Sequence, residues 1–236
     1  AKNGYTLPSH PKNLLRLIVD MKSIGLWSAL DAFYVFAGDA GSDFKCINLI
    51  DPGRFDATPY NSPIFSTAGV AGGTGNGYLS TGINPTDITL KAKQNDTLIM
   101  AVVENAVLGG GASNPYSTIW GLDASFSDAY STYRQWRRLN GDFNDETTLN
   151  IPGLFAIART GALTGWSTQK ETEQTLTNNS NALQNNTRTI FRQLTNYGRG
   201  TVSCYATGAS VAQSIMQKFR NKYNYFLLKE GQSQIA

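Results

Sequence analysis

The glycine-rich segment at residues 60–85, YNSPIFSTAGVAGGTGNGYLSTGINP, constrains the fold more than any other part of the sequence. It combines a turn at 61–63, a short apolar step at 64–65, a loop with five glycines, and a second apolar step at 78–79. Glycine adopts backbone angles that other residues avoid, and each proline biases the residue before it towards an extended conformation. A chain that turns and restarts at such short intervals is typical of short strands in a β-sheet.

This segment does not match a phosphate-binding loop. No lysine or arginine lies between Asp56 and Thr86, so the G-x-x-x-x-G-K-[ST] pattern is absent. The G-x-G-x-x-G pattern fails too, because Tyr78 stands where the third glycine belongs. We interpret the segment as a loop between strands and do not expect nucleotide binding.

Short strands separated by turns are expected along most of the chain. The predicted strands are 33–36, 45–50, 88–92, 98–103, 117–123, 129–139, 154–160, 163–170 and 201–207. The continuous apolar run at 98–103 is typical of a strand that is covered on both faces. Residues 33–36 also fit the end of a helical turn, and the short pattern at 187–194 fits either a strand or a helix.

One helix is expected near each end of the chain. From Lys12 onward, apolar residues share one helical face, and Gly25 is well placed to end that helix. Near the other end, apolar residues recur every four positions from 211 to 223, after an S-x-x-Q capping box at 210–213. With no alternating strand and helix pattern, the sequence predicts an all-β sandwich or barrel with a helix near each terminus.

Three stretches, taken together, resemble a known family. They are LWSALDAFYVFAG at 26–38, the run from INLIDPG through NSPIF to GYLSTGINP at 47–85, and FAIART at 155–160. In this order they resemble the concanavalin A-like (laminin G-like) jelly-roll domains of bacteriophage virion and tail-associated proteins, over about residues 12–228. The resemblance implies an all-β, antiparallel jelly-roll sandwich displayed on the surface of a virus particle. None of these stretches is a catalytic motif.

The resemblance also implies an organisation and a set of partners. Residues 1–30 form an arm and a helix that we expect to serve attachment or oligomerisation, and residues 31–236 form the jelly-roll domain with its C-terminal helix. The expected partners are other virion proteins, further copies of the chain in a homo-oligomer, with a trimer favoured, and a host-surface polysaccharide.

A carbohydrate site needs aromatic rings that stack on sugars, beside amide and carboxylate groups that bind hydroxyls. The candidate residues are Trp120, Tyr130, Tyr133, Trp136 and Trp166. Most large aromatic side chains are buried, so only part of this set is expected at the surface. Our main hypothesis is a non-enzymatic head-fibre, spike or tail-fibre protein that attaches to host-surface glycans.

Two alternatives stay open. The first is a carbohydrate-active enzyme on the same fold, which as a retaining glycosidase would need two carboxylates roughly 5 Å apart. Glu171 and Glu173 have suitable spacing, but Leu176 stands where the resembling hydrolases have a third acid. We therefore predict no enzymatic activity. The second alternative is a purely architectural virion protein.

Metal and thiol chemistry have little support in the sequence. Asp39 and Asp43 flank a glycine-containing turn whose oxygens can hold calcium, but the EF-hand spacing is absent. We expect an ordinary polar turn and no cofactor, with calcium as the alternative. Cys46 and Cys204 are too few for a disulfide framework or a zinc site. Two buried free thiols are expected, and a single bridge stays open.

The charge and hydropathy of the chain give little support to nucleic-acid binding or membrane insertion. The net charge is +3, and the nearest basic cluster is Arg134, Arg137 and Arg138. On a strand these three residues do not share a face, so we do not expect nucleic-acid binding. No apolar run reaches membrane-spanning length, so we expect no membrane insertion.

Overall fold

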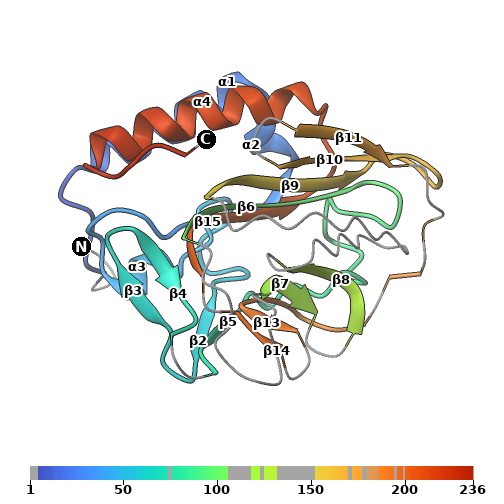
Figure 1. Ribbon diagram of the computed structural model, residues 1–236, viewed down its shortest axis with the longest axis horizontal. Coiled ribbons are helices and arrows are strands. Elements are labelled where there is room, and N and C mark those ends of the chain that lie inside the picture. The colour runs from blue at the N-terminus through green and yellow to red at the C-terminus, as the bar shows by residue number, and fades with distance from the viewer. Residues whose placement is uncertain are drawn as a thin grey trace.

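The chain folds into three layers: a pair of helices, a large β-sheet and a smaller β-sheet (Figure 1). Every described strand pairing between neighbours is antiparallel, and the two sheets share one core, which is consistent with the predicted β-sandwich. The computed structural model describes residues 5–73, 76–105, 118–122, 125–131, 152–169, 172–176, 180, 182–183, 185–193, 196–198 and 200–235.

The large sheet is built around β15. Its strand order is β11-β10-β9-β6-β15-β4-β3, and β1 also pairs with β15. The bounds are β1 Leu30–Val35, β3 Ile64–Ser66, β4 Gly69–Ala71, β6 Thr97–Asn105, β9 Gly153–Arg159, β10 Gly165–Gln169, β11 Thr172–Leu176 and β15 Thr201–Gly208. Along β15, β6 occupies one side, while β4 and β1 follow one another on the other side.

The apolar run of β6 is buried on both faces, as the sequence predicts. The odd-numbered residues from Ile99 to Val103 belong to the core between the sheets. The even-numbered residues from Leu98 to Val102 belong to the core beneath the helices. Because successive side chains of a strand point to opposite faces, a strand in the middle layer needs apolar residues at every position.

The smaller sheet packs against the large one and has the order β2-β5-β12-β7-β8. Its bounds are β2 Thr58–Tyr60, β5 Tyr78–Ser80, β7 Thr118–Leu122, β8 Ser125–Ser131 and β12 Arg188–Ile190, and a separate pair is formed by β13 Arg192–Gln193 and β14 Asn196–Tyr197. Residues 187–194 are therefore extended. The buried Arg188 side chain donates a hydrogen bond to Oγ1 of Thr207 on β15, which ties the two sheets together.

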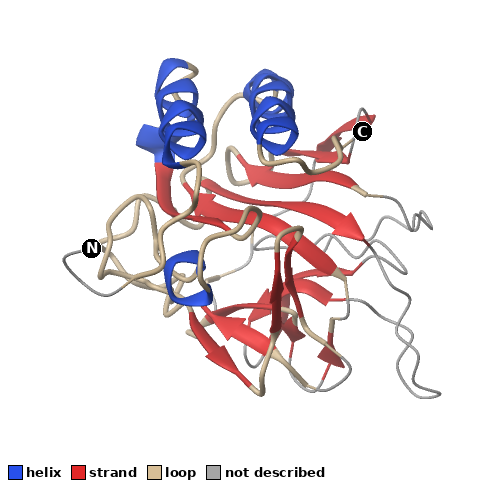
Figure 2. Ribbon diagram, turned by 90° about the vertical axis from the view of Figure 1, so that its left-hand side faces the viewer, coloured by secondary structure: helices blue, strands red, loops and turns tan. Residues whose placement is uncertain are grey.

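Two helices, α1 (Pro11–Ser23) and α4 (Ser214–Lys229), lie side by side on the outer face of the large sheet (Figure 2). The helix α1 ends at Ser23, and Gly25, with a left-handed φ of 79°, follows two residues later as the predicted stop. Leu17 and Met21 of α1 share one core cluster with Phe219 of α4 and with the sheet, so residues 11–23 pack as part of the same core. No helix in the described part of the chain is long and apolar enough to cross a membrane.

Three local predictions were wrong because tertiary contacts prevailed over local pattern. Residues 45–50 are not a strand: a short helix, α3 (Ser42–Lys45), is followed by turns. Residues 88–92 form turns as well. The capping box at Ser210 does not cap α4, because Ser210 donates hydrogen bonds from its N–H and hydroxyl to Asp96, and the helix begins at Ser214.

Candidate functional site

Of the aromatic residues selected from the sequence, the structure brings two together on neighbouring strands and places a third in a different sheet. Trp120 on β7 lies opposite Tyr130 on β8, and it is in register with the buried Ile190 of β12. Trp166 belongs to the core beneath the helices, with 6% of its surface exposed, and its Nε1 donates a 3.0 Å hydrogen bond to the Val211 carbonyl. Tyr133 and Trp136 lie outside the described residues.

A different aromatic cluster, which we call the tyrosine cluster, lies at the β2 edge of the smaller sheet; it consists of Tyr60, Tyr78, Tyr197 and Arg192. Tyr60 and Tyr78 face each other across β2 and β5, with ring centroids 5.0 Å apart and planes at 10°. Tyr197 follows at 6.3 Å from Tyr78. The Arg192 guanidinium carbon lies 4.6 Å from the centre of the Tyr78 ring, and Nη1 donates a 2.7 Å hydrogen bond to the Tyr78 hydroxyl.

The outermost ring of this cluster is presented to solvent. Tyr60 is 45% exposed, whereas Tyr78 behind it is buried. Pro59 fits the edge position of β2, because proline lacks the N–H that a central strand needs. After Tyr60 the chain turns through Asn61 and Ser62 at φ 53° and 57°, and Asn61 Nδ2 donates to the Asn76 carbonyl at 3.2 Å. The strand and the turn therefore fix the position of the exposed ring.

The tyrosine cluster combines the groups that bind a polar, ring-shaped ligand. A tyrosine ring offers an apolar face, and the hydroxyl offers a hydrogen-bonding group. These residues were not among those predicted from the sequence, although Tyr60 and Tyr78 flank the apolar and glycine-rich part of the segment at 60–85. The available signal was one tyrosine on each side of a turn-rich segment, but only the strand register shows that they meet.

The two candidate calcium ligands contact the chain that precedes α1. Ser9 N–H donates to Asp39 Oδ1 at 2.9 Å, and Thr6 N–H donates to Asp43 Oδ2 at 3.2 Å. The hydrogen bonds from Ser9 hold the pKa of Asp39 below its ordinary value. Among the described residues, neither carboxylate belongs to a group of three or more side chains that could hold a metal ion. Both acids thus anchor the N-terminal arm.

A cleft of about 320 Å³ adjoins Asp43 and the N-terminal arm. It is lined by Tyr5, Ser42, Asp43, Cys46, Ile47, Asp56, Ala57 and Pro59. The Asp56 carboxylate already accepts hydrogen bonds from the N–H groups of Asn48, at 2.8 Å, and Gly53, at 3.2 Å.

Burial raises the pKa of Cys46 to about 11, so its thiol stays protonated at neutral pH. Cys46 and Cys204 are both free and buried, as predicted.

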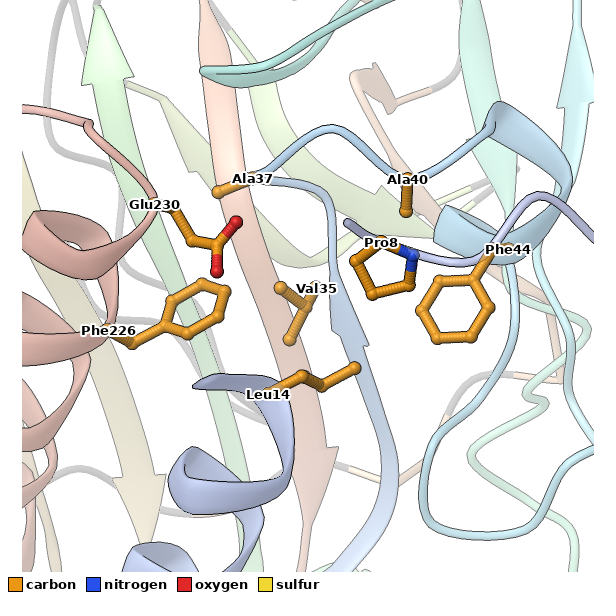
Figure 3. Close-up of a pocket in the computed structure, with 8 residues that line it drawn as sticks. All are labelled: Pro8, Leu14, Val35, Ala37, Ala40, Phe44, Phe226 and Glu230. Atoms are coloured by element: carbon orange, nitrogen blue, oxygen red, sulfur yellow. The ribbon is translucent and has the colours of Figure 1, made fainter. Parts of the chain in front are cut away.

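A second pocket lies between α1, α4 and the N-terminal arm (Figure 3). It is lined by Pro8, Leu14, Val35, Ala37, Ala40, Phe44, Phe226 and Glu230. Its volume of about 10 Å³ leaves room for a single water molecule at most. This pocket is a packing gap rather than a ligand site.

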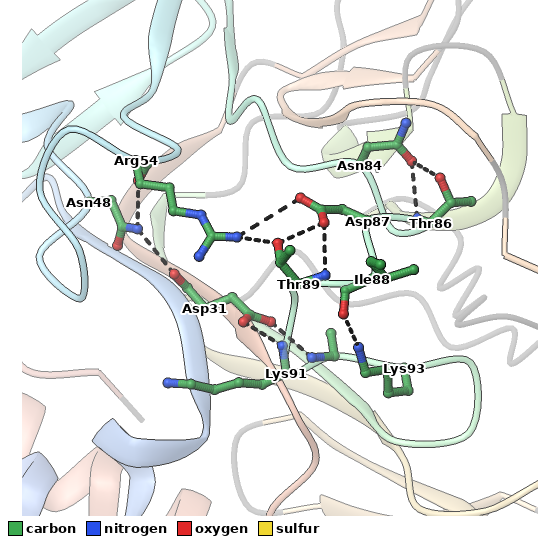
Figure 4. A network of polar contacts seen from close by, with 11 residues as sticks. Asp31, Asn48, Arg54, Asn84, Thr86, Asp87, Ile88, Thr89, Lys91 and Lys93 are labelled. Carbon is green, nitrogen blue, oxygen red and sulfur yellow. Dashed lines mark hydrogen bonds and ion pairs between the residues drawn. The ribbon is translucent and has the colours of Figure 1, made fainter.

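A polar network fixes the turns at 84–93 to the sandwich (Figure 4). The two oxygens of Asp31 accept hydrogen bonds from the N–H groups of Lys91, at 2.7 Å, and Ala92, at 2.9 Å. Arg54 forms an ion pair with Asp87 at 3.9 Å. The polar groups of this network bond to one another. The network therefore holds the segment at 84–93 in shape and offers no catalytic arrangement.

Of the two acids considered for glycoside hydrolysis, Glu171 and Glu173, the structure describes only Glu173. Glu173 lies on β11 at the edge of the large sheet, opposite Thr168 of β10. Glu171 lies outside the described residues.

The comparisons with known proteins give no assignment. Neither a protein-family model nor a curated protein matches the sequence. Among solved structures, the chain is similar to the receptor-binding domain of botulinum neurotoxin type G, at 11% sequence identity and a TM-score of 0.40, over 82% of this chain and 51% of that one. A second structure of a serotype G binding domain matches at 9% identity and a TM-score of 0.40, over 80% and 50%. The chain spans about half the length of these structures, and such TM-scores are too low to assign a fold or an activity.

Proposed function

We propose that this chain is a non-enzymatic bacteriophage virion-surface protein that binds host-surface glycans through the tyrosine cluster. In this proposal the sandwich is a concanavalin A-like jelly roll. The observation that carries the proposed site is the stacked pair of Tyr60 and Tyr78, with the exposed ring outermost at the sheet edge. The virion setting, the partners and the oligomer rest on the sequence resemblance.

The geometry suits weak, polar ligands such as sugars. The Tyr60 ring is held by its stacking partner and by the turn that follows it, so little side-chain freedom remains to be lost when a ligand binds. Its open face can stack on the apolar face of a sugar ring, while hydroxyl groups nearby can bond to the sugar hydroxyls.

Binding to an array of bacterial capsular and O-antigen polysaccharides tests the proposal. We expect saturable binding by the folded wild-type chain and at least a roughly fivefold weaker affinity for Tyr60→Ala, because a central aromatic contact contributes more than about 1 kcal/mol. Tyr60→Phe should keep most of the binding. Tyr225→Ala is the matched control, since Tyr225 is 50% exposed on α4, away from the cluster.

The same samples separate the alternatives. Release of reducing sugar into the supernatant would show a carbohydrate-active enzyme. Binding that Tyr60→Ala leaves intact would place the site elsewhere on the chain. Folded protein that binds no polysaccharide on the array would favour the architectural role, and light scattering of the same protein would show whether it forms a trimer.

A further inference from the structure

The outward side of α1 carries exposed apolar residues between two lysines. Lys12, Leu15, Val19 and Lys22 follow one another at spacings of three or four residues, so they share one helical face. All four are exposed, with Leu15 at 60% and Val19 at 52%. These residues point away from the core side of the helix, which carries Leu17 and Met21.

The outward side of α4 has the same character. Lys218, Asn221, Tyr225 and Leu228 again follow at three or four residues, and all are exposed. Tyr225 is 50% and Leu228 57% exposed. The Lys229 ammonium group lies 5.3 Å from the centre of the Tyr225 ring, so positive charge and apolar surface are adjacent.

Two contacts between α1 and α4 place the outward sides of the two helices next to each other. We call the surface that they form together the helix face. Asn13 Nδ2 on α1 donates to Glu230 Oε1 just after α4, at 2.8 Å. Lys222 on α4 pairs with Asp20 on α1 at 3.4 Å. From these two contacts the helices run antiparallel. They lie side by side along one side of the molecule (Figure 2). Four of the nine exposed large apolar side chains in the described part of the chain lie on these two helices.

The helix face carries three exposed lysines, Lys12, Lys22 and Lys218, and the two helices that form it are basic as a whole, although Glu230 follows α4. Residues 11–23 and 214–229 contain seven lysine or arginine residues and one aspartate, a net charge of +6, whereas the whole chain carries +3. Two copies that met through this face would bring like charges together, which disfavours a symmetric dimer there. The occupant must be anionic and must accept single apolar side chains.

We propose that the helix face docks peripherally on an anionic lipid surface. Basic helices that lie in the plane of a membrane bind by combining electrostatic attraction with burial of Leu and aromatic side chains at the headgroup boundary. A bilayer accommodates Leu15, Val19 and Leu228 without preformed pockets, whereas an acidic protein would need a complementary pocket for each of them. This inference does not depend on glycan binding.

Vesicle flotation provides the test, with vesicles of phosphatidylcholine alone or of phosphatidylcholine mixed with phosphatidylglycerol. We expect binding only to the anionic vesicles and a clear decrease at high salt. The double variant Lys12→Gln/Lys218→Gln should lose roughly fivefold in affinity for each lysine. Leu15→Gln/Val19→Gln should also bind more weakly, because it removes the apolar contribution. Gln is a good helix former, and the melting temperature of each variant verifies the fold.

A matched control makes the result specific. Ile88 is as apolar as Leu15 and Val19 and is 88% exposed, but it lies in the turns at 84–93. The Ile88→Gln variant should therefore bind vesicles like the wild type. Loss of binding in Ile88→Gln, or no binding to anionic vesicles at low salt, would overturn the proposal. Charge-dependent binding that Leu15→Gln/Val19→Gln leaves unchanged would overturn it in favour of a soluble polyanion. Self-association abolished by that double variant would show instead that a second copy occupies the face.

Tyr60→Ala distinguishes this proposal from the glycan-binding one. It should weaken polysaccharide binding and leave vesicle flotation unchanged. The helix-face variants should show the opposite pattern.

Discussion

The backbone N–H of Phe33 on β1 donates a 3.1 Å hydrogen bond to the side-chain oxygen of Asn48, which is fully buried. The same oxygen accepts a 3.1 Å bond from the Ile50 N–H. The amide nitrogen donates to the carbonyls of Asp31, at 3.0 Å, and Arg54, at 2.9 Å. The side chain of Asn48 therefore connects the large sheet to the segment at 48–56, and all the hydrogen-bonding capacity of its amide group is used.

Replacing this residue should destabilise the fold strongly. Asn48→Ala leaves four backbone groups without their partner, and a buried polar group without a partner costs about 1–3 kcal/mol. We expect a decrease of about 3 kcal/mol or more in the free energy of unfolding, measured by urea denaturation. Asn221→Ala, at an exposed position of α4, should change it by less than about 0.5 kcal/mol. Equal effects of the two substitutions would contradict this role.

Glu104, at the end of β6, should make stability depend on pH. Burial raises the pKa of its carboxyl above the ordinary value, and a hydrogen bond from Ser203 offsets this only in part. The folded state therefore binds the proton more tightly than the unfolded state. This contribution to stability is greatest below the ordinary pKa and is lost as the pH rises through the raised one.

Glu104→Gln removes that dependence. The variant should be more stable than the wild type at pH 8 and nearly equal to it at pH 4, where the wild-type carboxyl is protonated. Urea denaturation at several pH values measures the difference, which should grow with pH. A constant difference across the pH range would show that the carboxyl does not titrate in this way.

Substituting Asp39 and Asp43 should release the N-terminal arm, residues 5–9, from the rest of the fold. Asp39→Asn and Asp43→Asn weaken the charge-assisted bonds to Ser9 and Thr6, so amide hydrogen exchange in residues 5–9 should accelerate while β6 stays protected. Because the pKa of Asp39 is lowered, its bond is fully present above the ordinary pKa and is lost as the pH falls through the lowered value.

Calcium provides a control for this interpretation of the arm. If the carboxylates serve only the arm, added calcium should leave the exchange of residues 5–9 unchanged. Calcium-dependent protection, absent in Asp39→Asn, would establish the metal site that the turn also suggested.

Neither cysteine should react in the native protein. At pH 8 only roughly one Cys46 thiol in a thousand is ionised when its pKa is about 11, and burial raises the pKa of Cys204 further. Titration with a disulfide reagent should therefore detect two thiols only after denaturation. Fewer than two under denaturing, non-reducing conditions would indicate a bridge, contrary to the structure.

Local periodicity predicted much of the fold. The apolar run of β6, the strands β9 and β10, and both terminal helices follow from patterns within a few residues, and the structure confirms them. The predictions failed where distant residues compete for a segment. Asp31 holds residues 91–92 as part of a turn, and Asp96 takes the hydroxyl that was expected to cap α4.

The candidate site was less accessible to sequence reasoning. Trp166 was a reasonable choice by residue type, but α4 and the segment before it cover the ring. Tyr60 has the same chemistry and stays exposed because β2 is an edge strand. Residue type alone cannot separate these two outcomes, since burial depends on which elements pack over a residue.

The sequence by itself determined that this protein is a mostly antiparallel β-structure with two amphipathic helices, because hydrophobic periodicity is a property of neighbouring residues. Only the tertiary structure decided that Tyr60 meets Tyr78, that Asp39 and Asp43 hold the arm, and that α1 and α4 form one basic face. Each of these relationships joins segments through strand register or helix packing. Their energies come from contacts that form only when the whole core assembles.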